Sequence, residues 1–217
     1  MTLELDPDRR LALAYVPAAR RRAVEALWDL DVALGLVLAT GSDAMISRIR
    51  LAWWRESLEK LDRERAPAEP VLQALGAYVI PAGITGAELA GMEEGWSQLL
   101  SHEPLTRQEL EAYAQKRGGL LYRFSARLLG DEQFPVEDAG ARWALTDLAR
   151  HSSSPEEIEG ARAAARDRQS GTSWPAPLRP LGMLAMLAAR DLEREQPEIH
   201  GSPGRMLRMI WHRLSGH

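Results

Sequence analysis

The first residue that could do chemistry is an arginine on the apolar face of a predicted helix. In "SRIRLAWWRESLEKL" (residues 47–61) apolar residues recur at helical spacing, and Arg50 and Ser57 fall within their arc, between Trp53 and Trp54. A buried guanidinium keeps its charge, so it needs an anion or a water-filled cavity. The pattern therefore predicts either an internal ion pair or a site for an anionic ligand.

Asp31 is the candidate partner of Arg50, because it lies in the apolar arc of a helix predicted over 18–40. One interpretation is an Asp31–Arg50 pair that locks two adjacent helices. The other is that Arg50 faces a cavity and binds an anionic ligand. Trp53 and Trp54 fit core packing or, alternatively, the wall of a hydrophobic pocket.

Motifs for other kinds of chemistry are missing from the sequence. The five histidines show neither an i, i+4 pair nor His-Glu-x-x-His spacing, and cysteine is absent, so no metal site is expected. There is no P-loop, no Gly-x-Gly-x-x-Gly turn after a strand and no Gly-x-Ser-x-Gly elbow. The last helix, "GRMLRMIWHRLSGH", mixes arginine with apolar residues. We expect it to dock on its own bundle, with an anionic membrane surface as the alternative.

Sequence signals for helix starts repeat along the whole chain. The helices that they predict must position the candidate residues described above. Asp6-Pro7, Ser154-Pro155 and Ser202-Pro203 are typical helix starts, and Thr85 with Glu88 and Thr106 with Glu109 match the capping box. No segment alternates in the way a strand does. The sequence predicts one all-α domain over 1–217, with helices near 8–15, 18–40, 43–63, 68–79, 86–101, 107–129, 136–150, 155–168, 178–195 and 203–214.

Composition narrows the class of protein further. A net charge of -4 argues against a general nucleic-acid binder, and no apolar run reaches the roughly 20 residues of a membrane span. The first ten residues are acidic where a signal peptide would be basic and then apolar. We expect a cytoplasmic protein, either free or peripheral to the inner face of a membrane.

Several of these stretches together resemble the squalene/phytoene synthase family. "RRAVEALWDLDVALGLV" followed by "RIRLAWWRESLEKL" is the most specific match, and "WPAPLRPLGMLAMLAARDLERE" resembles a late helix of bacterial members. "YAQKRGGLLYR" and "WALTDLARH" resemble two further blocks and place Tyr113, Gly119, Thr146 and Arg150 on family positions. The resemblance implies an all-α isoprenoid-synthase fold and head-to-head joining of two prenyl diphosphates. It also implies Mg²⁺ held by two Asp-x-x-x-Asp motifs on facing helices.

Neither motif is present here. In register, the acidic positions of the first motif fall on Gly35, Leu36 and Ala39, and those of the second fall on His151 and Pro155. Asp29 and Asp31 are nearby but two apart, so they point to different faces of the helix and do not rebuild the clamp. Without it, departure of diphosphate loses its electrostatic support. We therefore expect no catalytic residue, no metal and no cofactor in a catalytically degenerate relative.

Three functional hypotheses follow. The favoured one is a non-enzymatic protein that contacts a protein partner or a membrane lipid, by analogy with the family's complex I assembly factor. The second is a prenyltransferase whose Mg²⁺ ligands come from Asp131, Asp138 or Asp147. The third is a carrier in which Arg50 and Arg150 hold the phosphate of a prenyl diphosphate or phospholipid. The predicted cavity-lining set is Asp31, Arg50, Trp53, Trp54, Tyr113, Gly119, Thr146 and Arg150.

Overall fold

The computed structural model of the chain is all-helical in the part that it describes, which covers residues 5–41, 43–101, 104–168, 171, 173–194 and 196–217. No strand occurs in these ranges, which confirms the predicted fold class. The helices are α1 (Pro7–Ala14), α2 (Ala18–Ala39), α3 (Ala44–Lys60), α4 (Pro70–Tyr78), α5 (Gly86–Ser97), α6 (Arg107–Tyr113), α7 (Leu120–Leu129), α8 (Glu137–His151), α9 (Pro155–Arg166), α10 (Arg179–Leu192) and α11 (Pro203–Ser215).

The predicted helix starts are confirmed atom by atom. The Asp6 carboxylate accepts hydrogen bonds from the backbone N–H groups of Asp8 and Arg9, at 2.9 and 3.0 Å. Both predicted capping boxes form, at Thr85 and Thr106, and Ser154 and Ser202 cap α9 and α11. Short-range rules therefore set most boundaries to within a few residues. His102 and the end of the helix predicted to reach residue 195 lie outside the described residues.

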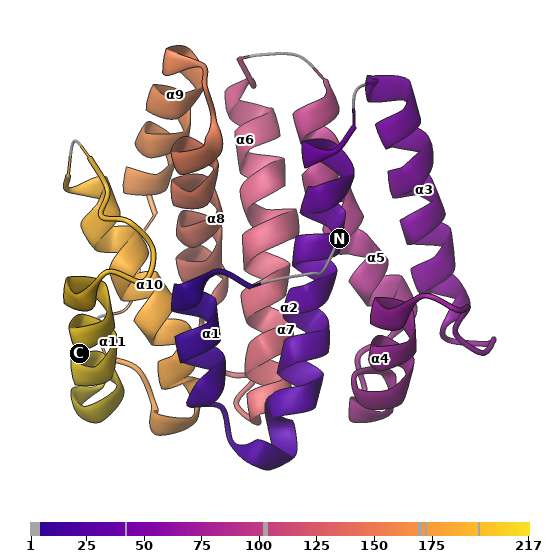
Figure 1. Cartoon of the computed structure of the whole chain (residues 1–217), viewed down its shortest axis with the longest axis horizontal. Helices are drawn as coiled ribbons and strands as arrows, with labels where there is room; N and C mark the ends of the chain where they lie inside the picture. The colour runs from indigo at the N-terminus through magenta and orange to yellow at the C-terminus, as the bar shows by residue number, and fades with distance from the viewer. Residues whose placement is uncertain (1–4, 42, 102–103, 169–170, 172, 195) are drawn as a thin grey trace.

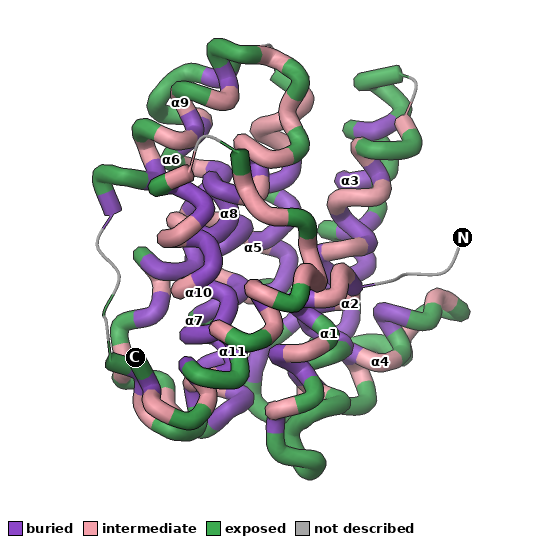
Figure 2. The backbone as a smooth tube through the Cα atoms, turned by 60° about the vertical axis from the view of Figure 1, so that its left-hand side comes forward, coloured by how far each residue is buried: buried purple, intermediate pink, exposed green. Residues whose placement is uncertain are grey.

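The axes of most helices lie roughly parallel to one another, with α3 at one end of the long axis of the molecule and α11 at the other (Figure 1). Buried residues gather along α2, α5, α7 and α8 in the middle of the molecule (Figure 2). Among the described residues, no helix combines the length and apolar character that a bilayer-spanning segment requires.

The face of α3 that packs inward differs from the predicted one. The buried residues are Ser47, Leu51, Trp54 and Leu58, at helical spacing, together with Ser57. A neighbouring stripe of Ile46, Ile49 and Trp53 was expected to contribute to the core, but these side chains are 44–63% exposed, and Met45 extends the stripe at 65% exposure. Because the apolar arc of α3 is broad, either of its two edges could pack against neighbouring helices. In the structure, the edge that carries the small Ser47 packs inward. The other edge of α3 is left to solvent.

A π-helical turn, Ala114–Gly119, separates α6 from α7. Such a turn inserts an extra residue and rotates everything that follows around the helix axis. Gly118 meets Gly140 of α8 so closely that a Cβ on Gly118 would lie 2.1 Å from the Gly140 carbonyl oxygen. The turn therefore lies directly against α8 and carries its side chains into the centre of the molecule.

Candidate functional site

The centre of the bundle holds a buried group of charges around Asp31 of α2. Asp31 is 1% exposed and accepts hydrogen bonds from Arg9 Nη1 at 3.0 Å, from Trp96 Nε1 at 3.1 Å and from Arg117 Nε at 2.9 Å. These donors come from α1, α5 and the π turn. Asp31 thus ties three separate segments to α2.

Arg117 lies between two carboxylates that belong to different helices. Its Nε and Nη2 atoms bind Asp31 of α2, while its Nη1 atom lies 2.7 Å from Asp147 Oδ2 of α8. Nη1 also donates to the hydroxyl oxygen of Tyr113. With 3% exposure, this guanidinium is a permanent interior cation whose hydrogen bonds are directed mainly to carboxylates.

Aromatic rings close the space around this cation. The Cζ atom of Arg117 lies 4.1 Å from the ring centroid of Trp96 and 4.9 Å from that of Trp143. The guanidinium of Arg9 also lies over Trp143, at 4.5 Å. Rings at this distance stabilise a desolvated cation and exclude water from it. We refer to Arg9, Asp31, Trp96, Tyr113, Arg117, Trp143 and Asp147 as the central cluster.

The electrostatics of the central cluster favour the charged form of both acids. Burial raises the pKa of Asp31, but Arg117 and Arg9 outweigh it, so this pKa lies below its ordinary value. For Asp147 the same balance of burial against Arg117 and Arg9 gives a pKa of about 2. Burial raises the pKa of the Tyr113 hydroxyl well above its ordinary value, so it stays protonated. No group of the central cluster is therefore poised to exchange a proton near neutral pH.

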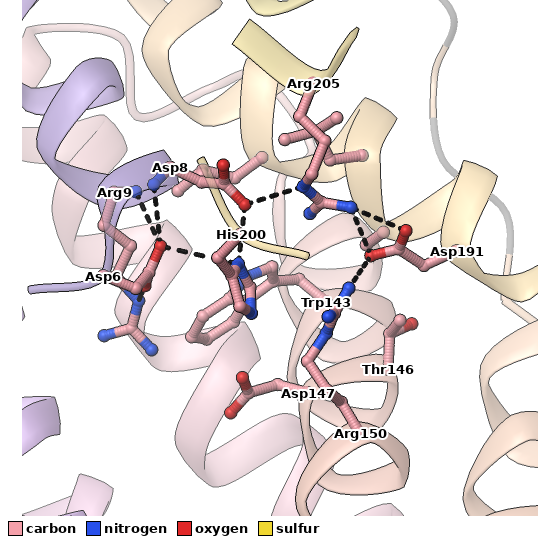
Figure 3. A pocket seen from close by; sticks show the side chains of 13 residues that line it. Asp6, Asp8, Arg9, Trp143, Thr146, Asp147, Arg150, Asp191, His200 and Arg205 are labelled. Atoms are coloured by element: carbon pink, nitrogen blue, oxygen red, sulfur yellow. Dashed lines mark hydrogen bonds and ion pairs between the residues drawn. The ribbon is translucent and has the colours of Figure 1, made fainter. Parts of the chain in front are cut away.

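A small cavity lies beside the central cluster, between α1, α8, α10 and the segment before α11 (Figure 3). Its volume is about 30 Å³, which leaves room for one or two water molecules. Arg205 crosses it, with Nε 2.9 Å from Asp8 and Nη1 2.7 Å from Asp191. Arg150 binds the same Asp191 at 2.8 Å. The walls of the cavity are thus joined by ion pairs.

One group of possible metal ligands occurs in the described part of the chain. Side-chain atoms of Asp6, Asp8 and His200 lie within 4.8 Å of one another at the cavity. Asp8 is already bound by His200 Nδ1 at 2.6 Å, by Arg205 and by the Gly201 N–H at 3.0 Å. Its negative charge is therefore compensated by protein groups.

The predicted Asp31–Arg50 pair is wrong. Asp31 binds Arg9 and Arg117, whereas Arg50 is exposed, on the same side of α3 as the unburied stripe. Arg50 belongs to the apolar arc of α3, as predicted, but the part of that arc that carries Arg50 faces solvent and not α2. Trp53 is 44% exposed for the same reason, while Trp54 is buried and meets it edge to face, with ring centroids 5.4 Å apart.

The other predicted residues gather in or near the centre. Tyr113 belongs to the central cluster, Gly119 is buried in the π turn, and Thr146 and Arg150 line the small cavity. The sequence reasoning missed Arg9, Trp96, Arg117 and Trp143. One signal was available for Arg117, because it lies four residues after Tyr113 and so shares its helix face.

Two comparisons gave no match: neither a curated protein nor a solved structure resembles the chain closely enough to be reported. The sequence model of the squalene/phytoene synthase family matches residues 4–159, which is more than two thirds of the chain. This family has the isoprenoid-synthase fold, in agreement with the all-helical structure. The matched residues include α1 to α8, with the central cluster, and stop before α10 and α11. The chain therefore belongs to the squalene/phytoene synthase family.

Proposed function

We propose that this chain is a non-catalytic family member that works through contacts with a protein or a lipid. The observation that carries the proposal is the position of Arg117 between Asp31 of α2 and Asp147 of α8. In the family, carboxylates on two facing helices hold Mg²⁺. Here one carboxylate from each of two helices is neutralised by a guanidinium of the chain itself.

The positions of the lost motifs support the same proposal. Gly35, in the place of the first motif, packs against Trp96 so tightly that a Cβ would lie 2.8 Å from its ring. His151 and Pro155, in the place of the second motif, are exposed. The small cavity beside the central cluster measures about 30 Å³, whereas sites for small molecules usually measure about 300–1,000 Å³. Two prenyl diphosphates would have to displace the central cluster.

The molecular surface supports the interaction half of the proposal. The unburied stripe of α3 and a second apolar stripe on α11 are exposed at the two ends of the molecule (Figure 1). Contiguous exposed apolar side chains of this kind are typical of binding surfaces. The proposal includes a single domain and a cytoplasmic protein that is free or peripheral to a membrane. The parallel with a complex I assembly factor remains an analogy.

The prenyltransferase alternative loses support from the surroundings of its candidate ligands. Asp138 lies 3.2 Å from Arg168 Nη1, Asp147 binds Arg117, and Asp131 accepts a hydrogen bond from the Phe134 N–H at 3.3 Å. The carrier hypothesis loses its pair of arginines, because Arg150 binds Asp191 beside the small cavity and Arg50 is exposed on α3.

The decisive experiment incubates the purified protein with prenyl diphosphates and Mg²⁺ and measures both diphosphate release and condensed product. We expect neither above background, while an active family member assayed in parallel gives both. Diphosphate release or condensed product above background from the wild-type chain would overturn the proposal, and loss of that turnover in Asp147→Asn would favour the alternative with Asp147 as a metal ligand.

A further inference from the structure

A hollow with an apolar lining is formed almost entirely by residues that follow the family-matched stretch, and Arg142 of α8 is the lining residue that lies within that stretch. A groove of about 740 Å³ runs between α10 and α11, at the end of the molecule opposite α3 (Figure 1). Its volume is within the usual range of small-molecule sites, about 300–1,000 Å³. Nothing in the central cluster or the small cavity contributes to its walls.

Most of the exposed wall of the groove is apolar, although six of its twelve lining residues are Arg, Glu or His. Trp174 and Met186 line it on one side, and Leu207 and Trp211 line it from α11. Leu207 and Trp211 are 68% and 69% exposed, and they begin a stripe that Leu214 continues at helical spacing. An apolar chain that lay in the groove would cover surface that is now in contact with water, which is favourable.

The groove also presents nitrogen donors that lack acceptors. The Nε–H group of Arg142 is a buried donor without a hydrogen-bond partner among the described residues, and both ring nitrogens of His212 are also buried without one. Burial lowers the pKa of His212, so its neutral ring offers one N–H donor and one acceptor nitrogen. His212 is 2% exposed, so this shortage is not met by open solvent. In the described part of the chain, Arg142 and Arg190 have no carboxylate within ion-pair distance. Nη2 of Arg142 donates to the Arg168 carbonyl oxygen, which leaves the Nε–H of Arg142, the guanidinium of Arg190 and the N–H of His212 available to an anion in the groove.

We propose that this groove binds a single-chain amphipathic anion of the long-chain fatty-acid type. The carboxylate would accept hydrogen bonds from Arg142, Arg190 and His212, and the hydrocarbon chain would lie along Leu207 and Trp211. Guanidinium groups suit a carboxylate because their donors match its two oxygens. The proposal goes beyond the proposed function, since it does not depend on whether the central cluster is catalytic.

The unpartnered donors favour a ligand that enters the groove over a partner that only covers it. A bilayer surface or the side of another helix could cover the exposed stripe of α11. Neither would place an acceptor beside the buried Nε of Arg142 or the ring of His212. An anionic head group on a flexible chain does both.

The test is a calorimetric titration of the full chain with monomeric oleate, in the absence of Mg²⁺ and prenyl diphosphate. We expect saturable binding of one oleate per chain, and weaker binding of the uncharged alcohol with the same hydrocarbon chain. Arg142→Gln, Arg190→Gln and Trp211→Ser should each weaken oleate binding by roughly tenfold. Arg190 is only partly buried, so Arg190→Gln keeps the test valid if Arg142→Gln does not fold.

The chain offers a matched control for each groove variant. Arg50→Gln and Trp53→Ser change the same residue types on an exposed face at the other end of the molecule and should leave oleate binding unchanged. No saturation by wild type would overturn the proposal, as would equal losses in the controls. Binding to vesicles of phosphatidylcholine and phosphatidylglycerol without binding of monomeric oleate would also overturn it and would favour a membrane surface. None of these results bears on turnover of prenyl diphosphates, so the two proposals fail separately.

Discussion

The central cluster and the outer face of α3 reverse the usual distribution of side chains. Arg117 and Asp31 are at most 3% exposed, whereas Ile49 and Trp53 on α3 are 63% and 44% exposed. Charged residues are rarely buried unless they are paired, and exposed apolar residues need explanation only when they adjoin one another. Both conditions hold here. The interior charges are arranged to hold helices together, and the exposed apolar stripes are available to something outside the chain.

The same comparison separates two uses of arginine. Arg117 contacts two carboxylates and two tryptophan rings, so its removal would leave uncompensated charge in the core. Arg50 is open to water, which solvates its charge in the folded and the unfolded chain alike. Substitution of Arg117 should therefore lower the free energy of unfolding much more than substitution of Arg50.

The largest expected effect is that of Arg117→Met. Removal of one partner from a buried ion pair costs about 3–5 kcal/mol, because the other charges remain buried. Asp31 would keep Arg9, while Asp147 would lose its one partner below 3 Å. Urea denaturation at neutral pH measures the loss, with Arg50→Met as the control, for which we expect a change within about 0.5 kcal/mol.

Restoring neutrality sharpens this prediction. In a double variant with Arg117→Met and Asp147→Asn, which keeps the Arg9–Asp31 pair, the two losses should not add, because the residues act as one unit. Additive losses would show that the central cluster is a set of independent contacts, and the comparison between core and surface arginines would then lose its basis.

How far the sequence predicts this arrangement depends on the range of the interactions. Helix starts such as Thr85 with Glu88 follow from contacts between residues three apart, and these predictions are confirmed. Burial of Asp31 is also predicted, because its position on the apolar arc of α2 is a local property. The identity of its partner is not local.

The partner was misassigned for a physical reason that the sequence does not carry. Pairing depends on which edge of α3 turns inward, and two overlapping stripes satisfied the same helical period. The actual partner, Arg117, lies on a π turn that changes the register between α6 and α7. Because a π turn has no reliable sequence signature, a regular helix over 107–129 is the best that periodicity can predict.

Acid should weaken the central cluster before it affects the surface stripes. The pKa of Asp147 is about 2 in the folded protein because Arg117 and Arg9 outweigh the effect of burial. Its ordinary value is 3.8, so the unfolded chain takes up the proton first as the pH falls. The stabilisation is fully present above about pH 4 and is lost toward about pH 2, an effect of roughly 2 kcal/mol from this residue.

Urea denaturation at a series of pH values between about 6 and 2 measures this loss. Asp147→Asn should be less stable at neutral pH and should show a shallower decline below about pH 4, since one titrating group is gone. An unchanged decline in Asp147→Asn would mean that other carboxylates, such as Asp31 and Asp8, account for the acid limb. Their pKa values are also lowered by neighbouring cations, against the opposing effect of burial.

The smallest expected effects on the free energy of unfolding are those of the exposed tryptophans. The adjacent residues Trp53 and Trp54 allow an exposed and a buried tryptophan to be compared on the same helix, α3. Trp54→Ser should cost about 3–5 kcal/mol because it empties a buried site, at 8% exposure. Trp53→Ser removes an exposed ring that keeps one edge-to-face contact, so we expect a loss of about 0.5–1.5 kcal/mol. Trp211→Ser, at 69% exposure, should change the free energy of unfolding by less than about 0.5 kcal/mol. If Trp53→Ser and Trp211→Ser destabilised the chain as much as Trp54→Ser does, these rings would be packed in the folded state. The stripes would then be part of the core, and neither end of the molecule would present an apolar surface to a partner.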